Sequence, residues 1–148
     1  MPRIEIEQIP ATNTTGYPAP YAAAVAGRWY RRLAPATGLT DFGASHVRLE
    51  PGAWSSQRHW HEGEDEMVVM LTGEAVLVDD RGETRLRPGD IAVFPKNDAN
   101  GHCLRNTGDV ECTVLAIGRP PVQDCHYADI DLVYSAERGY THMDGTPY

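Results

Sequence analysis

The stretch of sequence that decides the fold is Arg58-His-Trp-His-Glu-Gly-Glu-Asp-Glu-Met-Val-Val-Met-Leu-Thr-Gly73. It opens with two histidines two positions apart and closes with an apolar run that ends at a glycine. In an extended strand, residues i and i+2 point to the same face. His59 and His61 therefore share one face, and Trp60 points to the other. Two imidazoles with a carboxylate nearby can hold a divalent metal ion.

The sequence on both sides of this stretch predicts short β-strands separated by turns. Apolar segments alternate with turn signals such as Pro51-Gly52, Pro88-Gly89-Asp90 and the hairpin turn at residues 79–82. Strands are predicted near residues 47–49, 67–71, 75–78, 83–86, 91–94 and 112–117, with one more at 130–134. Short strands at this spacing are typical of a sandwich or a small barrel, and no long amphipathic helix is evident. The fold class is therefore predicted to be all-β.

The two ends of the chain differ from the middle. Residues 1–43 are predicted to form an N-terminal arm on the main body, residues 44–118 the barrel core, and residues 119–148 a C-terminal extension of the same domain. The alternation of Ile4, Ile6 and Ile9 favours a short edge strand, which predicts a homodimer paired across a two-fold axis. Arg28, Arg31 and Arg32 flank Trp29-Tyr30 and can close over a site, but a solvated arm is the preferred interpretation.

Composition narrows the function classes. The chain has 148 residues and a formal net charge of −8 with no basic block, which argues against nucleic-acid binding. No apolar run approaches the ~20 residues of a membrane span, and the N-terminus lacks the apolar core of a secretory signal. Cys103, Cys112 and Cys125 show no CxxC spacing, so a cytoplasmic location is expected.

Two ordered sets of residues resemble the motifs of the cupin superfamily. The first set reads Gly52, His59, Trp60, His61, Glu66 and Gly73, and the second reads Gly89, Pro95, Gly101, His102 and Asn106. The resemblance covers about residues 46–118 and departs at two points. Six residues separate Gly52 from His59, one more than is usual, and five separate Pro95 from Gly101, a loop insertion at residues 96–100 near the expected site mouth.

The resemblance implies a small double-stranded β-helix, or jelly-roll, barrel that holds one metal ion. Its ligands would be His59, His61, Glu66 and His102. The chain is also similar to bacterial single-domain cupins that carry Arg-His-Trp-His, Glu-Asp-Glu, Asn-Gly-His and a terminal Asp-Gly-Thr-Pro-Tyr, some of which are labelled sugar-phosphate isomerase-like. That label rests on analogy between folds and carries little weight for the reaction.

Neighbouring polar residues are assigned other roles. Glu66 is preferred to Asp65 as the ligand because it begins the apolar strand and has the motif spacing to Gly73. Glu64 and Asp65 can support the ligands from outside, although an exposed turn is the preferred interpretation. Cys103 is expected to face away from the metal, as Trp60 does. The remaining histidines, His46, His126 and His142, have no motif context and are expected to be ordinary surface or core residues.

The expected function is metal chemistry on a small polar organic molecule. Three imidazoles and a carboxylate suit Zn, Fe(II), Mn or Ni, and an octahedral ion would keep positions open for substrate. Isomerase, lyase and dioxygenase reactions all fit this centre. No catalytic base is assigned, since Tyr30, Tyr134 and Glu64 are candidates by residue type alone. The alternative is a non-catalytic cupin that binds or senses a small ligand through its metal.

Overall fold

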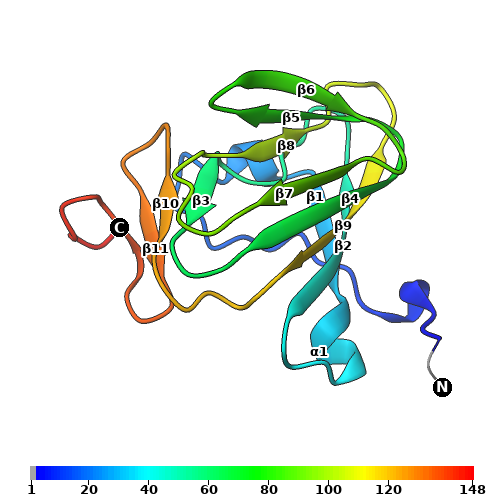
Figure 1. Cartoon of the computed structure of the whole chain (residues 1–148), viewed down its shortest axis with the longest axis horizontal. Coiled ribbons are helices and arrows are strands. Elements are labelled where there is room, and N and C mark those ends of the chain that lie inside the picture. The colour runs from blue at the N-terminus through cyan, green and yellow to red at the C-terminus, as the bar shows by residue number, and fades with distance from the viewer. Residues whose placement is uncertain (1–2) are drawn as a thin grey trace.

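The computed structural model describes residues 3–148 and confirms the predicted all-β jelly-roll fold (Figure 1). Twelve strands dominate these residues, and the longest helix among them, α1 (Leu33–Thr37), has five residues. No helix in the described range has the length and hydrophobicity needed to cross a bilayer.

The largest part of the barrel is an antiparallel sheet of five strands. In spatial order these are β1 (Arg28–Arg32), β2 (Gly43–Leu49), β9 (Cys112–Gly118), β4 (Glu66–Thr72) and β7 (Ile91–Phe94). Inward-facing residues of this sheet, including Val47, Leu49, Val68, Met70 and Val114, form the main hydrophobic core. Burying each such side chain contributes roughly 1.5–3 kcal/mol to stability, so the period-two apolar pattern fixes which face turns inward.

Two smaller antiparallel sheets complete the barrel. One contains β6 (Gly82–Leu86), β5 (Ala75–Asp79) and β8 (Cys103–Arg105). The other contains β12 (Gly139–Thr141), β11 (Val133–Ser135), β10 (Cys125–Tyr127) and β3 (His59–His61). An isolated bridge between His59 and His102 joins β3 to the residue before β8, and a second bridge pairs Trp54, ahead of β3, with Arg105 at the end of β8. This junction brings the two sequence motifs together.

The N-terminal segment differs from its predicted form. The edge strand predicted from Ile4, Ile6 and Ile9 is wrong, because Ile6–Gln8 form a 3-10 turn in which the Ile9 N–H donates to the Ile6 carbonyl at 3.0 Å. Among residues 3–148 no strand pairs with Ile6–Gln8, so the backbone hydrogen bonds of this turn are local. The homodimer prediction therefore loses the strand on which it was based. Further along, β1 pairs with β2 over its whole length and is an integral strand of the main sheet.

The C-terminal segment also contains more structure than its sequence pattern indicates. One strand was predicted at residues 130–134, whereas β10, β11 and β12 form a small meander beside β3, and β11 begins only at Val133. Each of these strands has three residues, too few to display an alternation that stands out from a loop. Their importance lies in position, because β10 lies directly against the two histidines of β3.

Two motif glycines are required by close contacts with neighbouring segments. Gly73 follows β4 with φ of +67°, and a Cβ there would lie 2.7 Å from the Glu111 carbonyl oxygen. Gly101 precedes His102, and a Cβ there would lie 2.6 Å from the Cβ of Ala128. Larger residues would force these segments apart. Gly101 thus lets the chain that carries His102 approach the C-terminal segment.

Candidate functional site

The two histidines of β3 point to one side of the strand, as the alternation predicts. Their Nε2 atoms lie 3.1 Å apart. Trp60 points to the other side, where its ring stacks on His126 with a centroid distance of 4.4 Å. His126 in turn contacts the Glu62 carboxylate at 2.7 Å. Trp60 and His126 therefore belong to the outer surface, and His59 and His61 to the barrel interior.

The structure brings all four predicted ligands together. Glu66 is the first residue of β4, and its Oε2 lies 3.2 Å from His102 Nε2, 3.3 Å from His61 Nε2 and 3.7 Å from His59 Nε2. Burial raises the pKa of Glu66, but its contacts with the three imidazoles hold that pKa well below the usual range. Glu66 is therefore a carboxylate at neutral pH. We call this set of four residues the His/Glu group.

Each imidazole is oriented by a different neighbour. The Nδ1 of His59 lies 3.0 Å from the Gln57 carbonyl oxygen, which favours a proton on Nδ1 and leaves Nε2 with a free lone pair. The His102 ring stacks on Phe94 with a centroid distance of 3.5 Å and an interplanar angle of 3°. Burial lowers the pKa of His102, which favours its neutral form. The Nε2 atom of His59 and the neutral ring of His102 are thus available to the interior.

His61 is oriented by a residue that the sequence interpretation placed wrongly. Glu64 was expected in an exposed turn, but its side chain is only 2% exposed and its Oε1 lies 3.0 Å from His61 Nδ1. The other oxygen accepts a long hydrogen bond from the Val122 N–H at 3.5 Å. The segment around Val122 covers Glu64. Because this segment is distant in sequence, the local pattern around Glu64 does not indicate that the side chain is buried. Asp65, by contrast, turns away and accepts a hydrogen bond from the Lys96 N–H at 2.9 Å.

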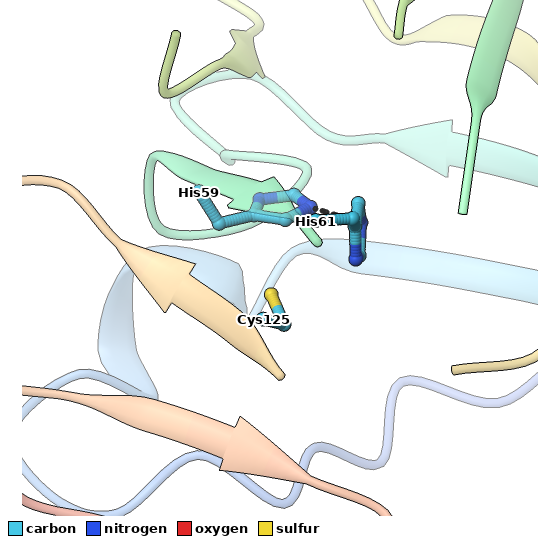
Figure 2. A group of neighbouring side chains, drawn as sticks. All are labelled: His59, His61 and Cys125. Carbon is cyan, nitrogen blue, oxygen red and sulfur yellow. Dashed lines mark hydrogen bonds between the residues drawn. The ribbon is translucent and has the colours of Figure 1, made fainter. Parts of the chain in front are cut away.

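Cys125 is a site residue that the sequence interpretation missed. It pairs with His61 across β10 and β3, so both side chains project to the same face. Its Sγ and one nitrogen each of His59 and His61 all lie within 4.8 Å of one another, and Figure 2 shows the sulfur pointing toward the two rings. The residue is 4% exposed. Cys125 could have been found from the sequence only by predicting strand β10, which places Cys125 and Tyr127 on one face.

The pKa of His61 is raised by its neighbours. Burial lowers its pKa, but contacts with the Cys125 thiol and the Glu66 carboxylate outweigh this effect and raise the pKa to about 10. In the metal-free protein His61 is therefore a cation at neutral pH, and its charge offsets that of Glu66.

These residues line a cavity of about 480 Å³. Aromatic and basic side chains share its wall, namely Tyr17, Tyr30, Tyr127, Tyr134, Tyr140, Arg28, Arg32 and Arg119. Tyr30 and Tyr134, the two tyrosines considered as bases, are among them. Burial raises the pKa of Tyr17, Tyr127 and Tyr140, so these phenols stay protonated and act as neutral hydrogen-bonding groups.

Comparison with known families identifies the family to which the barrel belongs. The family model described as the cupin domain matches residues 45–118. The chain therefore belongs to the cupin family, in agreement with the resemblance carried by its two motifs.

Individual relatives extend this comparison. A crystal structure described as a sugar phosphate isomerase of the cupin superfamily from Silicibacter pomeroyi is 42% identical, covers 99% of this chain and 96% of that one, and has a TM-score of 0.93. A cupin 2 conserved barrel domain protein from Salinispora arenicola is 28% identical, with a TM-score of 0.55 over 63% of this chain and 76% of that one.

A third relative is named for the ligand it binds. The oxalate-binding protein of Thermotoga maritima is 32% identical over 73 residues, which is 49% of this chain. The match spans 58% of that protein. Similarity to the Silicibacter pomeroyi protein, in contrast, extends through the N-terminal strand β1 and the C-terminal meander that complete the cavity.

Proposed function

We propose that His59, His61, Glu66 and His102 bind one divalent transition metal ion, either Zn, Fe(II), Mn or Ni. The observation that carries this proposal is the convergence of their four donor atoms in the barrel interior. The contacts between Glu66 Oε2 and the three histidines, and between the two β3 histidines, measure 3.1–3.7 Å. Neighbouring donors about 2.0–2.2 Å from one ion are separated by roughly 2.8–3.1 Å in octahedral geometry and roughly 3.3–3.6 Å in tetrahedral geometry. The residues present therefore fit such an ion.

The surrounding residues prepare the four donors for this role. Gln57 directs the proton of His59 to Nδ1, and Glu64 lies against Nδ1 of His61, so both rings direct Nε2 inward. Glu66 supplies the negative charge. When bound, a metal in this group would supply Lewis acidity or, with Fe(II), a centre for oxygen chemistry. The tyrosines of the cavity wall hold their protons and can orient the hydroxyl and carbonyl oxygens of a substrate.

We further propose that the protein is a metal-dependent enzyme acting on a small polar organic molecule. Support comes from the 480 Å³ cavity above the His/Glu group, whose size suits a small-molecule ligand. Isomerisation of a sugar phosphate is the first reaction to test, because the Silicibacter pomeroyi protein is 42% identical over 99% of the chain. Lyase and dioxygenase reactions are the other two classes. The cytoplasmic location and the homodimer remain predictions.

The first experiment measures metal content. Wild-type protein purified from its native host is compared by elemental analysis with His59→Ala/His102→Ala, and with His142→Ala as control, because His142 contacts Asp131 in the C-terminal tail. The double variant is expected to lose the bound metal, while His142→Ala keeps it. Equal metal content in wild type and double variant would overturn the proposal.

The second experiment separates an enzyme from a binding protein. Protein loaded with Fe(II), Mn(II) or Zn(II) is incubated with sugar phosphates, enols and aromatic diols, and both product and bound ligand are measured. Turnover supports the enzyme. Saturable binding without product would favour the alternative, a non-catalytic cupin, for which the oxalate-binding relative provides a precedent by name.

A further inference from the structure

Strand β1 directs one face of its side chains into the cavity. Arg28, Tyr30 and Arg32 line the cavity wall, as their i, i+2 spacing on a strand allows. Trp29 and Arg31 occupy the opposite face, where Trp29 Nε1 donates to Glu50 at 2.9 Å. The arginines interpreted from sequence as a solvated arm are thus divided between two environments.

The arginines on the two faces also differ in their ion pairs. Arg31 on the outer face binds Glu7 at 2.9 Å. In the part of the chain that the structure describes, no carboxylate oxygen lies within 4.0 Å of a nitrogen of Arg28 or Arg32. One Nη of Arg28 donates to the Ser55 carbonyl at 2.7 Å, and its Nε is shielded from solvent without any hydrogen-bond partner. The cavity therefore contains guanidinium groups whose charge no protein carboxylate neutralises.

Tyr30 holds the two arginines in place. The Arg28 guanidinium carbon lies 5.5 Å from the centre of the Tyr30 ring, and that of Arg32 lies 5.3 Å from it. The Tyr30 hydroxyl donates to the Thr14 carbonyl at 2.9 Å, which fixes the ring. Stacking on a fixed aromatic ring limits the freedom of each guanidinium before any ligand arrives. Because the guanidinium groups are already ordered, less conformational entropy is lost when a ligand binds.

The same cavity connects this row of residues to the His/Glu group. Tyr17 and Tyr127 lie along this connection. The ring centre of Tyr127 is 5.5 Å from that of Tyr17 and 5.9 Å from that of His59. The positive charge of Arg28 is near enough to Tyr17 to lower its pKa in part, against the larger effect of burial. The three acids that line the cavity have other partners: Glu64 contacts His61, Glu66 contacts the three imidazoles, and Asp65 accepts a hydrogen bond from the Lys96 N–H.

We propose that Arg28 and Arg32 bind an anionic group of the substrate, a carboxylate or a phosphate, and that the remaining oxygen atoms of the substrate face the His/Glu group. The paired N–H donors of a guanidinium match the oxygens of either anion. The second half of this inference rests on the proposed metal-dependent function. The first half does not, since the arginines need no metal to bind an anion.

The experiment measures binding of inorganic phosphate and of acetate to chelator-treated protein by calorimetry. Arg28→Gln and Arg32→Gln are compared with Arg31→Gln, the matched control on the same strand and the opposite face. The two cavity variants are expected to weaken anion binding by about tenfold or more, because each loses a charge-assisted contact with the anion. Arg31→Gln, which loses no such contact, should weaken it by less than about twofold. The two anions distinguish a phosphate site from a carboxylate site by which of them binds more tightly.

Two further variants keep the outcome clear. Arg28→Lys preserves the charge without the planar fork and should bind the anion with intermediate affinity. If Arg28→Gln unfolds, as judged by circular dichroism, Arg32→Gln decides the question, because Arg32 is exposed at the cavity mouth. Anion binding should persist in His59→Ala/His102→Ala, which separates this inference from the metal proposal. Wild-type affinity in both cavity variants, or an equal loss in Arg31→Gln, would overturn it.

Discussion

The Oε1 of Glu64 lies 3.0 Å from the Nδ1 of His61, an ion-pair contact between two atoms that are shielded from solvent and make no hydrogen bond within the described part of the chain. Because His61 uses its other nitrogen toward Glu66, this carboxylate contacts the ring from the side opposite the His/Glu group. Carboxylates in such positions fix the orientation of a metal-binding histidine and raise its basicity as a ligand. Glu64 is therefore a positioning residue for the proposed metal site.

Replacing Glu64 by glutamine should weaken metal binding by about 10–100-fold, because the amide keeps the shape of the side chain but removes the charge that orients His61. A competition titration with a chelator measures the change in Zn²⁺ affinity. Glu62→Gln is the matched control, since Glu62 belongs to the same turn but contacts His126 on the outer surface at 2.7 Å. An equal loss of affinity in both variants would indicate a general effect on the turn and contradict the role of Glu64.

Metal affinity should rise with pH through the neutral range. The contacts of His61 with Cys125 and Glu66 outweigh its burial and raise its pKa to about 10 in the metal-free protein, so the metal must displace a proton. A raised pKa stabilises the metal-free fold fully below the unfolded value of ~6.5, and this contribution is lost as pH rises toward 10. Zn²⁺ affinity should therefore increase by up to about tenfold per pH unit for each proton displaced. Titrations between pH 6 and 8 that give one constant affinity would rule out this competition.

The strands of the barrel and the shared face of His59 and His61 are predicted from the sequence because both depend on local pattern. The alternation of Val47 and Leu49 and the apolar run of β4 assign faces without knowledge of the partner strands. His59 and His61 converge because they are two positions apart. Glu66 and His102 were placed through the motif resemblance, and the bridge between His59 and His102 explains why the two motifs meet.

The parts that sequence analysis missed depend on contacts between distant segments. Cys125 reaches the site because β10 pairs with β3, and Glu64 is buried because the segment near Val122 covers it. Arg28 and Arg32 enter the cavity because β1 joins the edge of the main sheet. None of these three contacts has a local signature, since a three-residue strand and an arginine-rich strand both resemble solvated loops.

The position of Cys125 predicts a measurable sulfur contact with a bound metal. Its Sγ lies within 4.8 Å of the donor nitrogens of His59 and His61, and an ion about 2.1 Å from both nitrogens would leave the sulfur a short movement from bonding. Cobalt(II)-loaded protein should therefore show a near-ultraviolet sulfur-to-cobalt charge-transfer band. Cys125→Ser should remove this band, and Cys103→Ser, which alters an equally buried thiol on β8, should leave it unchanged. Identical spectra in all three proteins would identify Cys125 as a neighbour that does not bind the metal.

Acid stability should depend on the pair between Arg58 and Asp129. Arg58 precedes His59, and its Nε and Nη2 donate to the two oxygens of Asp129 at 2.9 and 2.8 Å, while Nη1 donates to Asp80 and to the Gly101 carbonyl. The fork therefore ties β3 to the loop after β10 and to the residue before His102. The Arg58 guanidinium is the main cause of a lowered pKa of Asp129, so this carboxylate contributes stability above its unfolded pKa of ~3.9 and loses it as pH falls through the lower folded value.

Asp129→Asn should consequently lower the free energy of unfolding at pH 7 by about 1 kcal/mol, a value limited by the half-exposed position of Asp129. The difference from wild type should shrink once pH falls below the unfolded pKa of ~3.9, because protonation of the unfolded chain then removes the contribution of the charge. Urea unfolding at several pH values measures both effects. Asp109→Asn, a change at an exposed turn, serves as control and should have no effect at either pH. If Asp129→Asn lowered the free energy of unfolding equally at pH 3 and pH 7, the charge of Asp129 would not be the cause. The decrease would then come from a changed geometry of the loop.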